Sequence, residues 1–338
     1  MKKLFPYISA ILLLFICAGC AKPAPAQRDF LAMDTFVSLT AYGANAAQAV
    51  NEAAETTVRL ENLISATHTT SEIYIANNSA AKQFTVSTQT ADILRTALAM
   101  CARTNGNMDI SLYPVVTAWG FTQAVHSVPD RAALDTLLQH VDYRKITVDA
   151  NTLHLPHPMM IDLGSIAKGY IADVCADIMA AHGVTSALLD FGGDLLAIGA
   201  KPDGTDWRIA VQDPLDESAK LGIVSLRDKA IVTSGGYARF FAQNGEIYWH
   251  IIDPKTGTPA RNGLISVTVI GETGTLCDGL STALFVMGKE AAIAHHALYN
   301  DFDMILVTDE NEVIITPNLR DSFTLLHTDI YRLAVIGE

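Results

Sequence analysis

The sequence is poor in basic residues and in cysteine. Among its 338 residues, 23 are Lys or Arg and 36 are Asp or Glu, which gives a formal net charge of −13. This balance argues against a nucleic-acid surface and against a polybasic membrane patch. The five cysteines are scattered apart from Cys17 and Cys20, so they indicate no disulfide framework. The sequence also has no internal repeat and no low-complexity segment.

What is present is enough apolar material for a large core. The apolar fraction is 50% and the aromatic fraction 7%, both values typical of globular proteins. A chain of this length holds one elaborate domain or two lobes. An acidic chain can still bind an anionic substrate, but a phosphate site would then depend on local features such as helix N-termini, a metal ion or single lysines.

The first 20 residues have the features of a secretory signal. Lys2 and Lys3 precede an apolar run over 4–16, and the run is short for a membrane-spanning helix. Small residues directly before Cys20 resemble a lipoprotein signal, which implies cleavage before this cysteine and a lipid on its sulfur. A plain signal peptide with an incidental cysteine is the alternative. Because Cys17 lies inside the same segment, the sequence argues against a redox or zinc site there.

This interpretation divides the chain into three parts. We expect a lipoprotein signal peptide over 1–19, a short extended, lipid-anchored tether over 20–28 and one folded domain over 29–335. The protein would then lie at the cell membrane, on its extracytoplasmic face.

Hydrophobic periodicity and turn residues predict mixed helices and strands. Helices are expected over Ala44–Ile64, over Gln89–Thr104, from after Pro129 to about His140, and over Cys277–Met287. A further helix is expected to follow a strand that starts at Met160 and to continue to about Ala181. Strands are expected over Phe30–Ala41, in a hairpin over Lys145–Leu155, and over Ser186–Asp190, Trp207–Val211, Leu264–Ile270, Met304–Val307 and Val313–Ile315. The last two are expected to close the chain as a strand pair. Gly192 and Gly193 indicate a bulge or a backbone cradle for a ligand.

The stretch Ile231–Pro259 concentrates polar residues between apolar runs. Asn244-Gly245 predicts a hairpin, with a strand over Glu246–Ile252 on its far side. Thr233 and Ser234 are expected to face His250 and Asp253 at one edge. An ordinary hairpin with a surface histidine is the alternative.

A second candidate site is the turn before a helix at 160–170. Ser165 is the expected N-cap, which places Lys168 in the first helical turn. Free N–H groups and a cation at a helix start favour an anion, and Asp162 could orient hydroxyl groups or a metal-bound water. A solvated lysine on a capped helix is the alternative.

A third candidate site is the start of the helix over Cys277–Met287. Asp278 and Thr282 are four residues apart, so their oxygens lie on one helical face. A carboxylate and a hydroxyl are hard ligands that suit Mg²⁺ better than Zn²⁺. The alternative is an aspartate that favours the helix dipole beside an unrelated threonine.

These separate signals occur together in the order found in one protein family. From about Phe30 onward the chain resembles the ApbE family, the FAD:protein FMN transferases. The matching segments are Met33-Asp34-Thr35, Gly106–Asp109 with Trp119-Gly120-Phe121, Asp162–Tyr170, Gly192-Gly193-Asp194, Thr233-Ser234-Gly235, His250–Pro254 with Thr256-Gly257, and Asp278 with Thr282. The resemblance implies an α+β fold of two lobes related to the tunnelling fold, with mixed and antiparallel sheets, flanking helices and FAD in the cleft.

The resemblance also implies a set of site residues. The flavin dinucleotide contacts of the family fall on Met33, Asn107, Met108, Asp109, Asp162, Lys168 and Ile252. The magnesium site falls on Asp278 and Thr282, with a backbone oxygen of Ser165 and with Ser281, and His250 and Asp278 are the catalytic residues. Thr67 departs from the pattern, since family members often carry a tyrosine there that stacks on the flavin.

The activity implied is Mg²⁺-dependent transfer of FMN from FAD to a Thr or Ser hydroxyl of an acceptor protein, with release of AMP. The acceptor would carry the pattern D-x-x-(S/T)-(A/G)-A-T, as expected of an extracytoplasmic electron-transfer subunit. Two alternatives remain open, a Mg²⁺-dependent FAD pyrophosphatase and a non-catalytic flavin-binding lipoprotein. Self-modification at 253–258 is rejected because that run lacks one residue of the acceptor pattern.

Overall fold

The computed structural model describes residues 24–123 and 125–338. The predicted signal peptide and Cys20 lie outside the described residues, so the lipid anchor stays a prediction. Residues 26–28, expected in the tether, are the first residues of strand β1 (Ala26–Ala32), because they pair with β2 (Thr35–Tyr42). Within the part of the chain that the structure describes, no helix is both long enough and apolar enough to cross a membrane.

The helices form close to where the sequence predicts them. They are α2 (Ala46–Ile64), α3 (Glu72–Asn77), α4 (Thr88–Arg103), α5 (Tyr113–Ala118), α6 (Arg131–Leu138), α7 (Ala167–Ala181), α8 (Gly274–Met287) and α9 (Lys289–Tyr299), with short 3-10 helices η1 (Ile110–Leu112), η2 (Tyr143–Lys145) and η3 (Pro317–Leu319). Side-chain caps start two of the expected helices, since Ser87 accepts from Thr90 N at 3.2 Å and Asp130 from Ala133 N at 2.7 Å.

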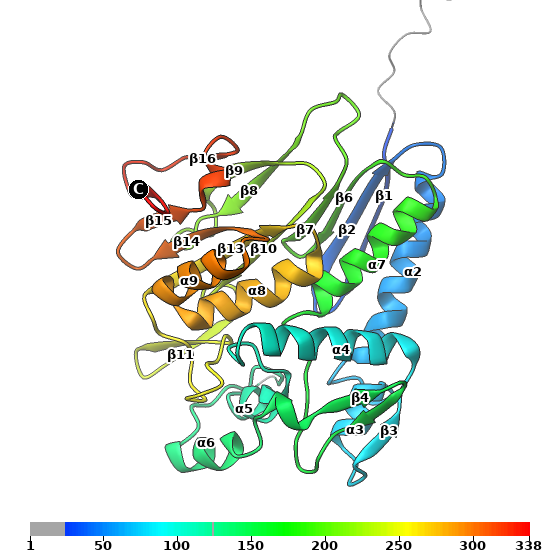
Figure 1. Cartoon of the computed structure of the whole chain (residues 1–338), viewed down its shortest axis with the longest axis vertical. Helices are drawn as coiled ribbons and strands as arrows, with labels where there is room; N and C mark the ends of the chain where they lie inside the picture. Colours follow the sequence, from blue (N-terminus) through cyan, green and yellow to red (C-terminus); the bar gives the residue numbers. More distant parts are fainter. Residues whose placement is uncertain (1–23, 124) are drawn as a thin grey trace, which may run out of the picture.

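A large sheet organises the upper part of the molecule in Figure 1. Its strand order is β1-β2-β6-β7-β10-β13-β14-β15-β17, antiparallel except for the parallel pair β15–β17. Besides β1 and β2, its strands are β6 (Ser186–Phe191), β7 (Asp194–Ile198), β10 (Lys229–Gly235), β13 (Leu264–Gly271), β14 (Asp303–Thr308), β15 (Glu312–Ile315) and β17 (Arg332–Val335). The chain therefore does not close on β14 and β15 as predicted, because β17 adds to the edge of β15.

Both faces of this sheet are covered, and neighbouring residues of one strand show how. In β10, Ala230 and Val232 pack in the main core, while Ile231 between them packs in a second core. Successive side chains of a strand point to opposite faces, so the two cores lie on opposite sides of the sheet. The helices α2, α7 and α8 supply the main core, and the small sheet β16-β9-β8 supplies the second. The strands of that sheet are β8 (Trp207–Gln212), β9 (Lys220–Leu226) and β16 (Phe323–Leu325).

The lower part of Figure 1 is a smaller lobe. It holds α3 to α6 and the three-stranded sheet β3-β5-β4, and the hairpin of β11 and β12 lies between it and the large sheet. These strands are β3 (Gln83–Thr85), β4 (Thr147–Asp149), β5 (Thr152–His154), β11 (Phe240–Gln243) and β12 (Glu246–Trp249). The predicted α+β class, with mixed and antiparallel sheets and flanking helices, is confirmed.

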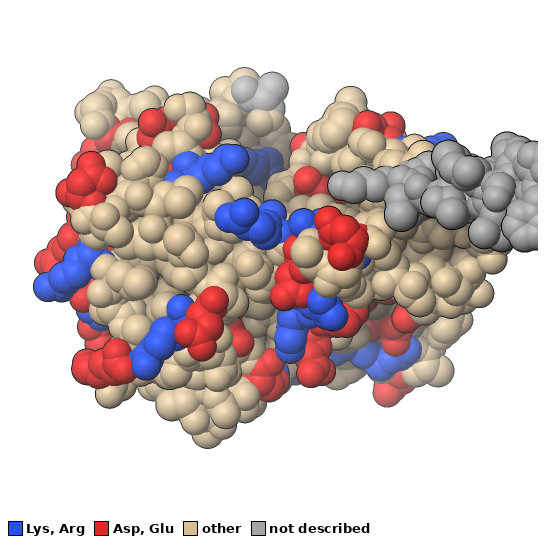
Figure 2. Space-filling model, turned by 90° about the horizontal axis from the view of Figure 1, so that it is seen from above, with Lys and Arg blue, Asp and Glu red and all other residues tan. Residues whose placement is uncertain are grey.

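On the face seen in Figure 2, basic side chains lie between acidic ones.

Two predicted strand features are hairpin turns. The segment expected as one strand over Phe30–Ala41 is the β1–β2 hairpin, with Met33 and Asp34 at φ 53° and 56°. Gly192 and Gly193, at φ 71° and 96°, form the turn between β6 and β7 rather than a bulge. Two consecutive residues with positive φ are what a two-residue hairpin turn requires. The two turns are adjacent, because a Cβ on Gly192 would lie 1.9 Å from Thr35 Oγ1.

The β11–β12 hairpin confirms the prediction from Asn244-Gly245, but its neighbours differ. The strand expected to reach Ile252 ends at Trp249, and Ile252 forms only an isolated bridge with Pro259. The strand that carries Ser234, β10, pairs with β7 and β13 instead of with this hairpin. The expected common edge is therefore not made by strand pairing.

The predicted strand at Met160 and the predicted cap at Ser165 are both wrong. Residues 160–163 form no strand, because single contacts hold them: Ile161 N donates to Asn77 Oδ1 at 2.8 Å and Asp162 N to Ile110 O at 2.9 Å. The helix α7 starts at Ala167 after Ile166, without a side-chain cap. Lys168 is nevertheless in its first turn, as predicted.

Candidate active site

The candidate site centres on Lys168. Its Nζ forms an ion pair with Asp194 on β7 and lies 4.0 Å from Asp278 Oδ1 on α8. Burial lowers the pKa of Lys168, but the two carboxylates outweigh burial and raise it, so the lysine stays charged. Burial, opposed by Lys168 and reinforced by the charge of Asp278, raises the pKa of Asp194 to about 6. Two buried carboxylates thus share one lysine.

Close packing of α7 against α8 brings these groups together. A Cβ on Gly169 would lie 2.2 Å from Gly274 O, so only glycine allows the two helix starts to approach this closely. Gly169 N then donates to Asp278 Oδ2 at 2.9 Å. Thr273 caps α8 by accepting from Leu276 N, which makes Asp278 the fifth helical residue rather than the helix start. Asp278 is only 3% exposed and lies within α8, so its predicted position at the helix start is wrong.

Hydroxyl groups surround the next turn of α8. Ser234 Oγ lies 2.8 Å from Ser281 Oγ and 3.4 Å from Thr282 Oγ1, and Ser281 Oγ donates to Asp278 O at 2.9 Å. Ser281 is fully buried. The structure therefore places Asp278, Ser281 and Thr282 together, with Ser234 as an additional hydroxyl.

The donor set suits a hard cation of small size. In the described ranges 24–123 and 125–338, no group of three or more His, Cys, Asp or Glu side chains could hold a metal ion. A site here would instead combine the Asp278 carboxylate with hydroxyl and carbonyl oxygens, the mixture that Mg²⁺ accepts together with water and phosphate oxygens. Because Asp194 and Asp278 outnumber Lys168 in a buried place, an added positive charge would be favourable.

His250 is held by its neighbour across the hairpin. The main-chain N–H of His250 donates to Arg239 O at 3.1 Å, and the ring Nδ1 lies 3.2 Å from the same oxygen. A carbonyl oxygen only accepts, so Nδ1 carries the proton and Nε2 keeps a free lone pair in the neutral ring. Burial and the charges of Arg239 and Lys168 lower the pKa of His250 to about 4. The imidazole is therefore neutral near pH 7.

Asp162 lies near the same charges. Burial raises its pKa, opposed by hydrogen bonds from the Gly164 and Leu163 N–H groups and by the charge of Arg239. The charge of Asp162 in turn acts on Tyr113, whose hydroxyl donates to Ala66 O at 3.2 Å. This tyrosine thus connects the Asp162 turn with the polar turn that carries Thr67.

Asn107, Met108 and Asp109 are tied into the smaller lobe. Asp109 accepts from Ser111 N at 2.8 Å, Ser111 Oγ at 2.6 Å and Tyr143 N at 3.1 Å. Asn107 donates to Thr104 O at 2.8 Å and accepts from Lys255 Nζ at 3.2 Å. Met108 is 2% exposed, so a ligand could reach only its main chain.

The remaining predicted residues are each held by neighbours outside the Lys168 cluster. Met33 N donates to Glu61 Oε1 at 2.7 Å, and its turn is adjacent to the Gly192-Gly193 turn before Asp194. Thr67 is exposed, and its hydroxyl lies 3.0 Å from Ser65 Oγ in the same turn. Ile252 is 3% exposed and packs in a core with Trp119. Ser165 is partly buried, just before α7.

Two residues of the site had no predicted role. Asp194 stands in the quoted segment Gly192-Gly193-Asp194, but nothing local indicates that it pairs with Lys168. Arg239 lies in the connection between β10 and β11, and only the folded chain shows that it holds His250. The position of Asp194 directly after two glycines could have marked it as a site residue. No feature of the sequence around Arg239 indicated a role in the site.

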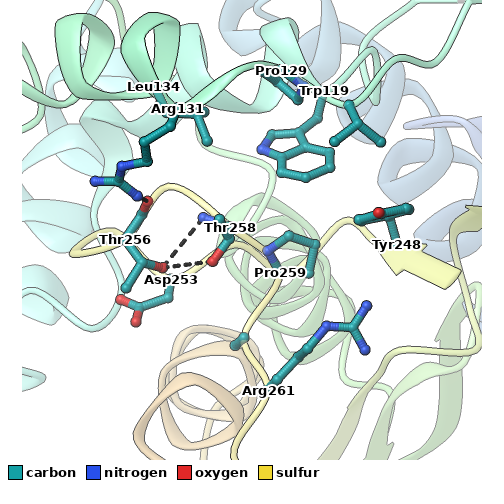
Figure 3. A pocket seen from close by; sticks show the side chains of 12 residues that line it. Trp119, Pro129, Arg131, Leu134, Tyr248, Asp253, Thr256, Thr258, Pro259 and Arg261 are labelled. Carbon is teal, nitrogen blue, oxygen red and sulfur yellow. Dashed lines mark hydrogen bonds between the residues drawn. The ribbon is translucent and has the colours of Figure 1, made fainter. Parts of the chain in front are cut away.

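A cavity of about 440 Å³ is lined in part by the loop 253–261. Figure 3 shows Trp119 and Tyr248 on one side of it and Thr256 and Thr258 on the other, with Arg131 pointing toward Thr256. The residues that line it include none of the cluster around Lys168. We place the candidate site at the cluster, because the charged and hydroxyl groups converge there.

Comparisons with known proteins identify the family of the chain. The model of the ApbE family matches residues 33–306. A protein of Vibrio cholerae named FAD:protein FMN transferase is 33% identical over 85% of this chain and 89% of its own length. One of the same name from Treponema pallidum is 31% identical over 92% of both chains.

Solved structures give the same result. The ApbE protein of Thermotoga maritima superposes with a TM-score of 0.80 at 28% identity, covering 91% of this chain and 100% of its own. The flavin transferase ApbE of Vibrio cholerae superposes with a TM-score of 0.77 at 27% identity, covering 90% and 97%. The chain therefore belongs to the ApbE family.

Proposed function

We propose that this protein is an FAD:protein FMN transferase that requires Mg²⁺ and acts at the Lys168 cluster. The observation that carries the proposal is the convergence of Lys168, Asp194 and Asp278 beside a neutral His250, in a chain whose relatives bear that name. Phosphoryl transfer requires mainly positioning and neutralised charge, which such a cluster supplies.

The reaction joins an acceptor hydroxyl to the FMN phosphorus of FAD. The new P–O bond forms to the Thr or Ser oxygen, the bond between the two phosphates breaks, and AMP leaves with the bridging oxygen. The hydroxyl proton goes to a base, and His250 Nε2 is the candidate because Nδ1 is held by Arg239 O. Lys168, in the first turn of α7, would hold the pyrophosphate near the helix N-terminus.

The residues that would hold Mg²⁺ are Asp278, Thr282, Ser281 and the carbonyl of Ser165. When bound, the ion would neutralise phosphate charge as the P–O–P bond breaks. Gly169 N fixes one oxygen of Asp278 and leaves the other facing the space beside Lys168. This arrangement orients the carboxylate before any ligand enters.

The contact residues Met33, Asn107, Met108, Asp109, Asp162 and Ile252 would position FAD from both lobes. Thr67 offers a hydroxyl where a stacking tyrosine is expected, and its exposure leaves room for water. This favours hydrolysis of FAD as the second candidate activity, in which water replaces the acceptor and the products are free FMN and AMP.

The acceptor would be an extracytoplasmic electron-transfer subunit with the pattern D-x-x-(S/T)-(A/G)-A-T, and the enzyme would be held at the membrane by a lipid on Cys20. Support for the anchor comes from the small residues before this cysteine and from the start of the folded domain at Ala26. Cys20→Ala should release an active protein into the soluble fraction. Unchanged membrane retention of this variant would contradict the anchor.

A direct assay tests the activity. Purified protein is incubated with FAD, Mg²⁺ and a peptide that carries the acceptor pattern. We expect AMP release together with a peptide mass gain equal to that of FMN less water. Equal amounts of FMN and AMP with an unmodified peptide would instead identify a pyrophosphatase.

A further inference from the structure

Arg239 is a cation of the site that pairs with no carboxylate of the described residues. Lys168 is paired with Asp194, but no ion pair within 4.0 Å involves Arg239 in the described part of the chain. Its Nη2 donates to Phe121 O at 2.8 Å, which uses one of the five guanidinium donors. Since the residue is exposed, the other donors are open to a ligand.

The position of Arg239 is fixed from two sides. Its carbonyl accepts from His250 N and lies 3.2 Å from His250 Nδ1, and its side chain binds the 119–121 turn of the smaller lobe. The preceding Gly236 allows this connection to pack on the Trp249 ring, because a Cβ there would lie 3.0 Å from the ring. The guanidinium is therefore held between the two lobes rather than free in solvent.

The charge of Arg239 reaches the groups of the candidate site. Burial is the largest cause that lowers the pKa of His250, and the charge of Arg239 is the second largest. It also opposes the effect of burial on the pKa of Asp162, and it acts weakly on Lys168. These groups come from two segments, the 160–170 turn with the start of α7 and the hairpin that carries His250. The charge of Arg239 therefore acts on the space between these segments, where a ligand would enter.

We propose that Arg239 contacts the pyrophosphate of the dinucleotide and stabilises the charge that develops as the phosphate bond breaks. A planar guanidinium with open donors binds phosphate oxygens in pairs, which a lysine cannot do. Arg239 would thus approach the phosphates from the hairpin side, while Lys168 approaches them from α7. The inference rests on the proposed function and assigns a catalytic residue to it.

The test compares Arg239→Ala with the matched variant Arg261→Ala. Like Arg239, Arg261 donates to a main-chain carbonyl, here that of Ile247 in the hairpin, but its guanidinium stacks on Trp249 at 4.6 Å. We expect Arg239→Ala to reduce the rate of FMN transfer about 100-fold or more, as for loss of one preorganised donor to a transition state. Arg261→Ala should remain within about threefold of the wild type.

Two further readouts separate contact with phosphate from a structural role. Arg239→Ala should weaken FAD binding but leave binding of riboflavin, which has no phosphate, unchanged. Millimolar guanidinium should restore part of the lost activity in this variant and none in Arg261→Ala. Arg239→Lys, which keeps the charge without the fork, should be intermediate.

Several outcomes would overturn the inference. They are a transfer rate of Arg239→Ala near that of the wild type, equal loss of FAD and riboflavin binding in a folded variant, or no response to guanidinium. Circular dichroism of each variant shows whether it is folded, and Arg239→Lys replaces Arg239→Ala if the latter is not. If the wild type itself transfers no FMN, the proposed function fails, and the comparison of FAD with riboflavin binding still decides the role of Arg239.

Discussion

The two lobes satisfy their charged groups in different ways. On the side of α7 and α8, two buried carboxylates share Lys168, and the charges are not balanced. In the smaller lobe, the carboxylate of Asp109 accepts three hydrogen bonds from Ser111 and Tyr143. The first side thus has excess negative charge that favours a metal ion, whereas the second uses its polar groups to hold the lobe together. Chemistry is therefore expected from the first side and recognition through the main chain from the second.

The largest effect should come from Asp278→Asn. This change keeps the size of the side chain but removes the charge that would hold Mg²⁺, so turnover should fall at least about 100-fold. EDTA should silence the wild type, Mg²⁺ should restore it, and Ca²⁺ should restore it poorly because its longer bonds misplace the phosphates. Initial rates of AMP release measure all of these effects.

Thr282→Val is the control for this prediction, since it removes a neutral ligand and should have a milder effect. Because Asp278 is buried, thermal unfolding must show that Asp278→Asn keeps its fold. Full activity of a folded Asp278→Asn, or of the wild type in EDTA, would contradict the proposed Mg²⁺ site.

The next effect is that of Lys168→Ala on ligand binding. Without the lysine, FAD should bind about tenfold or more weakly, while FMN, which lacks the pyrophosphate, should be affected less. The variant should also lose about 3–5 kcal/mol of stability, because it leaves Asp194 and Asp278 unpaired in a buried place. Fluorescence titration and chemical denaturation measure the two effects.

The double variant Lys168→Ala with Asp194→Asn sharpens this test. It should recover part of the stability, because it removes one unpaired charge, but not the binding of FAD. Recovery of both would mean that Lys168 only balances Asp194. Equal loss of FAD and FMN would place the lysine away from the pyrophosphate.

A smaller effect on catalysis is expected in the other lobe. Asp109→Asn breaks the set of hydrogen bonds to Ser111 and Tyr143, so it should reduce stability by about 1–3 kcal/mol. Because Asp109 is also one of the predicted FAD contacts, the rate is compared at saturating FAD, where it should stay within about threefold of the wild type as long as the variant is folded. A large loss of rate without loss of stability would show that Asp109 takes part in the chemistry and would break the comparison between the lobes.

The smallest effect concerns His250 and pH. Its pKa of about 4 lies below the ordinary value of 6.5, so the unfolded chain binds this proton more readily than the folded one. The contribution of His250 to stability is therefore full above about pH 6.5 and is lost as the pH falls toward about 4. His250→Gln should show a weaker decline of unfolding free energy between about pH 6.5 and pH 5 than the wild type. An identical decline in both would contradict the burial of a neutral imidazole.

Local sequence signals were enough for much of the fold and for part of the site. The hairpin at Asn244-Gly245 followed from its turn residues. Lys168 lies in the first turn of α7 as predicted, although the Ser165 cap from which this was predicted is absent. The start of α8 could not be predicted in this way, because glycine disfavours helices. Gly274 is nevertheless needed there, because α8 packs closely on Gly169 at this point. The missing strand at Met160 has a similar cause, since Asn77 and Ile110 supply its hydrogen bonds from elsewhere in the chain.

The rest of the site depends on tertiary contacts. No local pattern pairs Lys168 with Asp194, and none shows that the Arg239 carbonyl fixes the tautomer of His250. The burial of Asp278 also became visible only in the folded chain. The residue types of the site could thus be predicted from sequence, but not their charge balance.

The central claim is that the Lys168 and Asp278 side performs FMN transfer to a hydroxyl. The most direct measurement is the intact mass of an acceptor peptide after incubation with FAD and Mg²⁺, using the wild type, Asp278→Asn and Asp109→Asn in parallel. The account predicts a mass gain equal to FMN less water with the wild type and with Asp109→Asn, and none with Asp278→Asn. A mass gain with folded Asp278→Asn, or none with the wild type, would contradict it.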